Sequence, residues 1–243
     1  MSLTVSAVAP VYNEEGACVQ VAREIAAAFS EAFGPDGFEI VMVDDCSTDA
    51  TLTRLQAAKA ELPQLRVLHH THNAGKSRAL RTGVFAVRAP VFVTLDGDGQ
   101  NPAADAARLA QRLIAAGPDV GMVAGQRRNR QDTASKKWAS RLANAIRKSL
   151  LKDGSDDTGC GLKALRREVF LRLPYFDQMH RYLPTLVAHQ GFSILFETVE
   201  DRPRATGQSK YTNLGRLAVA LTDLPGVLWL NSRQRRPGPV SEI

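Results

Sequence analysis

Short apolar, β-branched runs alternate with helical patterns through the first half of the chain, and this alternation limits the possible folds more than any other feature. The runs cover residues 3–11, 38–44, 65–70, 90–95 and 119–125. The helical patterns between them cover residues 15–33, 49–61, 75–88 and 103–116. A succession of this kind is typical of βαβ units, and it predicts an α/β fold with a mostly parallel sheet flanked by helices.

Polar clusters follow four of these runs, with the sequences NEE, DDCSTD, HNAGKS and DGDGQNP. Open α/β sheets bind ligands beyond the carboxyl ends of their strands, so we expect the four loops to share one rim. Ser47 or Asp49 is expected to cap the helix that begins near residue 50. Asn101 is expected to cap the helix that ends near residue 116, with Pro102 at its first position.

The chain has 243 residues, of which 44% are hydrophobic, and this is enough for one large α/β domain. We expect a catalytic domain over residues 1–212, a C-terminal helical segment over 213–232 and a basic, partly disordered tail over 233–243. Three widely spaced cysteines without a CxxC pair argue against a disulfide framework and against a zinc site. The sequence also lacks a basic signal-peptide start and an 18-residue apolar run, which predicts a cytoplasmic chain without an ordinary membrane span.

The net charge of +6 is concentrated between Arg127 and Lys152, where nine Lys or Arg residues face a single acid, Asp132. Such a block predicts an anionic partner: phosphates, lipid headgroups or nucleic acid. Residues 134–152 place apolar side chains on one helical stripe, which fits a helix at a membrane interface or an ordinary surface helix; the lack of acids from 133 to 152 favours the membrane. Because Trp138 is the block's one aromatic residue, we do not expect nucleic-acid binding.

The loop LDGDGQNP presents Asp96, Asp98 and Gln100 at every second position, which predicts a cation site or an acid/base site. A calcium loop of the helix-loop-helix type is excluded, since Asn101 and Ala107 stand where it needs Gly and Glu. A phosphatase of the haloacid dehalogenase type and a plain polar turn remain alternatives.

The segment HNAGKS carries the Gly-Lys-Ser of a phosphate-binding P-loop, but His70 stands where the cradle needs its first glycine. Two interpretations remain: a helix start whose amides meet an acidic group, or a capped helix start without a ligand.

Five motifs together are far more specific than any one of them. APVYNEE, VDDCSTD, HNAGKSRAL, TLDGDGQNP and DDTGCGLKAL occur in the order and near the spacing of family 2 glycosyltransferases. The chain resembles the polyprenyl-phosphate branch of that family, the dolichyl-phosphate mannose synthase type, from residue 3 to about residue 210. RPRATGQSKY, at residues 202–211, adds the R-x-x-G-x-S-K signature of the branch.

The resemblance implies a GT-A-type fold with a C-terminal helical appendage. It also implies an inverting enzyme that moves a sugar from a UDP- or GDP-sugar to a polyprenyl phosphate in one displacement, without a covalent enzyme intermediate. The enzyme would act peripherally at the cytoplasmic face of the membrane, on the surface itself or docked to a membrane protein. A family 2 enzyme with a polysaccharide acceptor is the alternative, a non-enzymatic anion-binding protein is a weaker one, and a homo-oligomer stays open.

The resemblance also implies residue roles. Mg²⁺ or Mn²⁺ would be held against the donor diphosphate by Asp96, Asp98 and Gln100, with Asp98 also catalytic. The nucleotide would contact Asp96 and Asp98 together with Pro10, Tyr12, Glu14, Asp44, Asp45 and Lys76. Asp157 would be the base or the acceptor-positioning group, with Asp156 as a rival. The acceptor phosphate would meet Arg127, Arg130, Arg204, Ser209 and Lys210. Structural alternatives exist: Tyr12 as a core residue, and Asp45 as a residue that orients the turn into Ser47.

Overall fold

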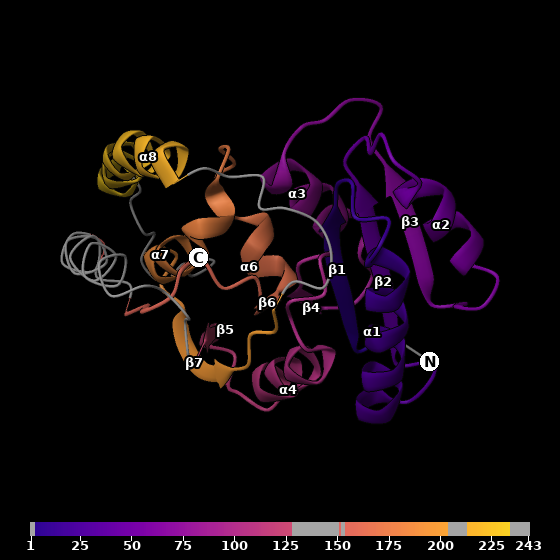
Figure 1. Ribbon diagram of the computed structural model, residues 1–243. Helices are drawn as coiled ribbons and strands as arrows, with labels where there is room; N and C mark the ends of the chain where they lie inside the picture. Colours follow the sequence, from indigo (N-terminus) through magenta and orange to yellow (C-terminus); the bar gives the residue numbers. More distant parts are fainter. Residues whose placement is uncertain (1–2, 128–150, 152–153, 204–212, 234–243) are drawn as a thin grey trace, which may run out of the picture.

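The computed structural model describes residues 3–127, 151, 154–203 and 213–233, and of residues 213–222 it describes the backbone. Its centre is a seven-stranded sheet in the order β3-β2-β1-β4-β6-β5-β7, shown in Figure 1. The strands are β1 (Val5–Val11), β2 (Phe38–Asp44), β3 (Leu65–His69), β4 (Val91–Thr94), β5 (Val120–Arg127), β6 (Lys163–Arg166) and β7 (Ser193–Val199). All neighbours pair in parallel except β6, which runs antiparallel to β4 and β5. The predicted fold class is therefore confirmed.

Helices cover both faces of the sheet, as Figure 1 shows. They are α1 (Cys18–Phe33), α2 (Thr51–Ala58), α3 (Lys76–Ala86), α4 (Ala103–Ile114), α6 (Arg167–Leu171), α7 (Leu183–His189) and α8 (Asn213–Arg233), with a 3₁₀ turn η1 (Met179–Arg181) before α7. The first four match the four helical patterns predicted from the sequence. Of the described helices, none is long and apolar enough to cross a membrane.

Alternate side chains of the central strands point to opposite faces of the sheet and pack into two separate hydrophobic cores. In β2, Ile40 and Met42 join the core under α1 and α4, whereas Val41 and Val43 join the core under α3, α6 and α7. All four side chains are fully buried. A strand that is apolar on both faces must be covered on both faces, which explains the continuous hydrophobic runs in the sequence.

Two elements of the sheet were not predicted. The strand β6 is only four residues long, and β7 is an edge strand with mostly half-exposed side chains. Neither gives the long apolar run that marks the five predicted strands.

The two predicted helix caps have different outcomes. Asp49 stands one residue before Ala50, the N-cap of α2, and its Oδ1 accepts a hydrogen bond from the backbone N–H of Thr51, the first residue of the helix, at 2.9 Å. The prediction for Asn101 was wrong, because its Oδ1 accepts from the backbone N–H of Asp96 at 2.9 Å and Pro102 occupies the N-cap position of α4. Asn101 thus closes the loop of residues 95–102, called the aspartate loop below, instead of starting the helix.

The amphipathic segment predicted over 134–152 lies outside the described residues except for Leu151, which is buried in the core under α3. The tail predicted over 233–243 likewise lies outside them, apart from Arg233.

Gly83 allows α3 to lie close against the sheet, and replacing it should destabilise the protein. A Cβ at this position would sit 2.5 Å from Val8 Cγ1 and 3.1 Å from Val43 Cγ2. We expect Gly83→Ala to lower the free energy of unfolding by about 1–3 kcal/mol through overpacking. Gly226→Ala in α8 is the matched control, because nothing lies within 4 Å of its Cβ, and it should be neutral or stabilising by up to about 1 kcal/mol. Urea denaturation measures both; equal effects would contradict the packing argument.

Candidate active site

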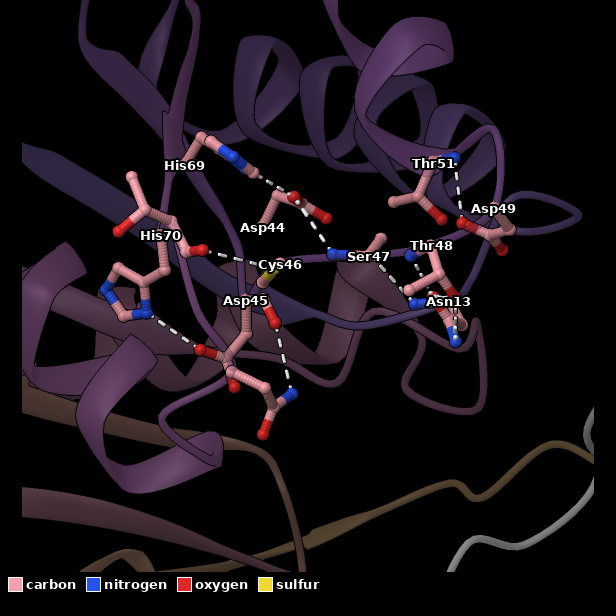
Figure 2. Close-up of polar contacts among 12 residues, drawn as sticks. Asn13, Asp44, Asp45, Cys46, Ser47, Thr48, Asp49, Thr51, His69 and His70 are labelled. Atoms are coloured by element: carbon pink, nitrogen blue, oxygen red, sulfur yellow. Dashed lines mark hydrogen bonds and ion pairs between the residues drawn. The ribbon is translucent and has the colours of Figure 1, made fainter.

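The loops after β1 and β2 are joined by hydrogen bonds between side chains and backbone, as Figure 2 shows. Asn13, in a left-handed conformation with φ of 51°, donates its backbone N–H to Ser47 Oγ at 2.9 Å and accepts from the Thr48 N–H at 2.7 Å. The Glu14 N–H donates to Thr51 Oγ1 at 2.8 Å. These reciprocal bonds fix one corner of the rim that the sequence predicts.

Asp45 fixes the next corner. Its carboxylate accepts hydrogen bonds from the backbone N–H of Ala74 at 2.9 Å and of Gly75 at 2.7 Å, and it contacts the His70 ring at 2.7 Å. The sequence left Asp45 open between ligand contact and orientation of the turn into Ser47. The Ser47 N–H is instead bound by Asp44, and Asp45 orients the loop that begins α3. His70, which stands in place of a P-loop glycine, is therefore an anchor for the aspartate. Lys76 follows as the first residue of the helix.

Asp44 has a different environment from its neighbour. It is fully buried, its Oδ2 contacts the His69 ring at 2.8 Å and accepts from the Ser47 N–H at 3.3 Å, and Figure 2 shows this pairing. Asp44 does not line the cavity that opens over the carboxyl ends of the parallel strands.

A cavity of about 710 Å³ opens over the carboxyl ends of the parallel strands. It brings together ten residues that the sequence assigns to the site: Pro10, Tyr12, Glu14, Asp45, Lys76, Asp96, Asp98, Gln100, Arg127 and Asp157. The expected common rim is therefore confirmed. Four further predicted residues, Arg130, Arg204, Ser209 and Lys210, lie outside the described part of the chain.

Asp96 lines this cavity and forms an ion pair with the ammonium of Lys76. Burial opposes the charged form of Asp96, but Lys76, with help from Lys163 and Arg127, holds the pKa of its carboxyl below the usual value. Gly161 lies directly against this carboxylate, and a Cβ there would be 2.6 Å from Asp96 Cγ. Asp96 is thus an ionised carboxylate held in a fixed place.

Asp98 and Gln100, the other two proposed ligands in the aspartate loop, are held by hydrogen bonds. Asp98 is buried, and its Oδ1 accepts from the Gln100 N–H at 3.2 Å. The side-chain amide of Gln100 donates to the Arg202 carbonyl at 3.2 Å, and the Arg202 N–H donates back to the Gln100 carbonyl at 3.0 Å. The loop is thereby tied to the segment that leaves β7.

The donor set of this loop fits a hard cation that is shared with a ligand. Within the described residues, no three His, Cys, Asp or Glu side chains form a ready-made metal centre. Asp96 and Asp98 supply two carboxylates, and Mg²⁺ is commonly bound by one or two carboxylates together with phosphate oxygens of a substrate. The chemistry of the residues present therefore suits a metal that a diphosphate completes.

Asp157 is engaged with Arg127 through a two-pronged ion pair. Arg127 Nε lies 2.6 Å from Asp157 Oδ2, and Arg127 Nη2 lies 3.0 Å from Asp157 Oδ1, while Nη1 approaches Asp201 at 3.5 Å. The bond to Asp157 raises the pKa of Arg127 above its already high value. The rival residue Asp156 is exposed and does not line the cavity, so the geometry favours Asp157 as the site residue.

Three basic residues of the cavity were missed by the sequence assignment: Lys163, His180 and Arg181. Lys163 stands inside the motif DDTGCGLKAL, so its position was visible although no role was assigned to it. His180 and Arg181 stand in a stretch without a recognisable motif, and only the packing of η1 against α3 brings them to the site.

Comparison with known proteins gives a consistent result. A model of the family "Glycosyl transferase family 2" matches residues 6–173. The chain is 30% identical over 241 residues to a dodecaprenyl-phosphate galacturonate synthase of Rhizobium johnstonii, covering 98% of this chain and 70% of the relative. It is 34% identical over 222 residues to an undecaprenyl-phosphate 4-deoxy-4-formamido-L-arabinose transferase of an Enterobacter species, covering 90% of this chain and 66% of the relative. The chain thus spans about two thirds of these proteins.

Solved structures share the fold. A mannosyltransferase from Pyrobaculum calidifontis, in complex with GDP-mannose and Mn²⁺, superposes with a TM-score of 0.67 at 21% identity, over 98% of this chain and 66% of that one. A mannosyl-3-phosphoglycerate synthase from Rubrobacter xylanophilus gives a TM-score of 0.69 at 20% identity, over 98% of this chain and 79% of that one. The arrangement of sheet and helices is the GT-A fold that the sequence predicts.

The contact between Gly161 and Asp96 makes a sharp test of the aspartate loop. A methyl group at Gly161 would displace the Asp96 carboxylate, so Gly161→Ala should weaken Mn²⁺-dependent binding of UDP or GDP by more than about tenfold. Gly159→Ala is the matched control, because its Cβ would meet Arg127 Nη2 at 3.4 Å and Asp157 Oδ1 at 3.5 Å, which are ordinary contacts. Calorimetry reports both affinities; an unaffected Gly161→Ala would show that Asp96 does not set nucleotide affinity.

Proposed function

Because the chain belongs to glycosyl transferase family 2, we propose that it transfers a sugar from a UDP- or GDP-sugar to a polyprenyl phosphate. The observation that carries this proposal is one cavity that joins the aspartate loop to the Arg127–Asp157 pair. The first group suits a diphosphate with its metal, and the second suits a phosphate acceptor. Relatives named for dodecaprenyl- and undecaprenyl-phosphate products support the acceptor class.

The nucleoside would lie at the corner of the rim made by the loops after β1 and β2. Pro10, Tyr12 and Glu14 line the cavity there, and Asp45 reaches it while holding the 72–77 loop. Asp44 is fully buried beside them, so its part in nucleotide binding would be support of this corner rather than contact.

Asp96 and Asp98, with the side-chain oxygen of Gln100, would hold Mg²⁺ or Mn²⁺ against the donor diphosphate. Such an ion neutralises the negative charge that develops on the departing nucleotide. Lys76 is paired with Asp96 and lines the same cavity, so its ammonium would add positive charge at the diphosphate. Metals in solved relatives of the fold, Mn²⁺ in one and Mg²⁺ in another, support this assignment.

Asp157 would act mainly by positioning. A phosphate monoester is already largely ionised near neutral pH, so its oxygen needs no strong base to attack the anomeric carbon. Asp157 instead aims the Arg127 guanidinium, whose fork suits phosphate oxygens, toward the cavity. Arg130, Arg204, Ser209 and Lys210 would complete the acceptor phosphate site.

A lipid phosphate acceptor places the reaction at a membrane surface. We propose peripheral attachment at the cytoplasmic face, through the basic segment between Arg127 and Lys152 or through a membrane-protein partner. The charge of that segment, nine bases against one acid, is the supporting observation.

The donor assignment is tested by calorimetric titration of UDP and GDP with Mn²⁺, Mg²⁺ or EDTA. We expect one nucleotide to bind in a metal-dependent way. Asp98→Ala should then weaken that binding by at least about tenfold, because the loop loses one of its two carboxylates. Asp36→Ala, an exposed acid remote from the rim, is the control. Unchanged affinity of Asp98→Ala in Mn²⁺ would remove the metal assignment.

The acceptor assignment is tested by transfer of radiolabelled sugar to undecaprenyl phosphate. Asp157→Asn should lower kcat/KM by about a hundredfold or more, because Arg127 loses its charged partner, while nucleotide affinity stays near wild type. Asp156→Asn should keep nearly full activity, since Asp156 is exposed. Donor hydrolysis without transfer in the wild-type protein would point to a non-lipid acceptor instead.

A further inference from the structure

His180 is held rigidly at the wall of the cavity by a residue of α3. Its Nδ1 lies 2.8 Å from Ser77 Oγ, and its backbone N–H points to the same oxygen at 3.5 Å. Ser77 is fully buried and directly follows Lys76 at the start of the helix. Ser77 Oγ thus contacts both the ring and the backbone N–H of His180, and the ring contact orients the imidazole.

The contact with Ser77 bears on the ring protons of His180. A hydroxyl donates one hydrogen bond and accepts two, so Ser77 Oγ can accept the His180 backbone N–H and also donate its own hydrogen to Nδ1. In that arrangement the neutral ring carries its proton on Nε2, as a hydrogen-bond donor. The hydrogen bonds of the described residues occupy only Nδ1 of this ring, and His180 lines the cavity. Nε2 is therefore the ring nitrogen left for a ligand.

Lys163 is a second cavity residue without an assigned partner in the proposed reaction. Its side chain is 4% exposed, and its ammonium donates to the carbonyls of Thr158, at 3.4 Å, and Cys160. Within the described residues no carboxylate lies within ion-pair distance of it, because the two nearest acids are committed elsewhere: Asp96 to Lys76 and Asp157 to Arg127. A buried ammonium bound only to carbonyl oxygens favours an anionic ligand.

The surroundings of His180 are also cationic. Burial, followed by the charges of Lys76, Lys163 and Arg181, lowers the pKa of His180 well below its ordinary value. The ring therefore stays neutral near pH 7 and serves as a directional donor, while the lysine supplies the charge.

We propose that His180 and Lys163 form an oxyanion subsite of this cavity, in which His180 Nε2–H and the Lys163 ammonium bind one anionic group of a substrate. The group is a carboxylate on the transferred sugar or the phosphate of the acceptor, and in naming these sources the proposal rests on the proposed function. The donor diphosphate is assigned instead to the aspartate loop. The two residues would thus determine which sugar or acceptor is accepted.

The first experiment does not depend on the enzyme's substrates. In ¹⁵N-labelled protein, the ring signal of His180, identified by its loss in His180→Gln, should report a neutral ring protonated at Nε2. Inorganic phosphate should shift that signal saturably, and Lys163→Met should abolish the shift. A ring protonated at Nδ1, or a signal that phosphate does not move, would overturn the subsite even if nucleotide binding succeeds.

The second experiment separates the two sources with Mn²⁺ present. UDP, UDP-glucose, UDP-glucuronate and farnesyl phosphate are titrated into wild type, His180→Leu and His180→Gln, with the GDP counterparts if GDP is the nucleotide bound. We expect His180→Leu to lose at least about tenfold in affinity for UDP-glucuronate alone, or for farnesyl phosphate alone, which identifies the source. His180→Gln, which keeps an N–H donor, should recover most of the loss.

His189→Gln is the matched control, because His189 bonds the Asn231 carbonyl and lies outside the cavity lining. Melting temperatures close to wild type keep the comparison valid. Equal affinities of His180→Leu and wild type for every probe, or an equal loss that includes UDP itself, would overturn the assignment. Wild-type protein that binds no nucleotide would defeat the proposed function, while the phosphate titration would still decide the subsite.

Discussion

The geometry of the site depends on the hydrogen bonds that the carboxylate of Asp45 accepts. This carboxylate receives two backbone N–H groups of the loop that precedes α3, from Ala74 and Gly75, and Gly75 adopts a φ of 85° that favours glycine. This anchoring sets where the helix begins and hence where Lys76 and Ser77 stand. Lys76 then pairs with Asp96, and Ser77 clamps His180. The Lys76–Asp96 and Ser77–His180 contacts therefore both depend on the position that this one buried carboxylate gives to the start of α3.

The cavity is also arranged by charge. Two ion pairs cross it, Lys76 with Asp96 and Arg127 with Asp157, and each places a cation and an anion at the points where phosphate groups are proposed to bind. Pairing holds these four partly buried charges in fixed positions, because each carboxylate lies beside its cation. Within the described residues, Lys163 is a cavity cation whose ammonium donates to carbonyl oxygens and not to a carboxylate. A substrate anion would balance its charge, so electrostatics alone already favours ligands with more than one negative group.

Sequence periodicity predicted the fold well where strands are buried on both faces. Five long apolar runs became five strands, because continuous hydrophobicity has few other uses in a chain with polar loops. The strands β6 and β7 were not predicted, because β6 is short and β7 is an exposed edge strand. For the site, predicted residues in the loops after the strands lie together at one cavity, whereas His180 was missed because its partner Ser77 is 103 residues away. The misassigned cap at Asn101 has a different cause: a side chain's choice among several nearby backbone donors is decided by the folded loop.

The contact between Gln100 and Arg202 extends this reasoning across the whole site. The aspartate loop and the segment after β7 exchange two hydrogen bonds, one through the Gln100 side chain and one through backbone, and Asp201 next to them approaches Arg127. The nitrogen of the Gln100 amide holds the segment, which leaves its oxygen as the atom that a cation would take. A cation bound to that oxygen would restrict the orientation of the Gln100 amide. It would thereby strengthen the contact with the segment that leads to the R-x-x-G-x-S-K signature. The proposed donor and acceptor sites are thus connected through two hydrogen bonds between Gln100 and Arg202, so the fold itself would set the spacing between a bound diphosphate and an incoming phosphate.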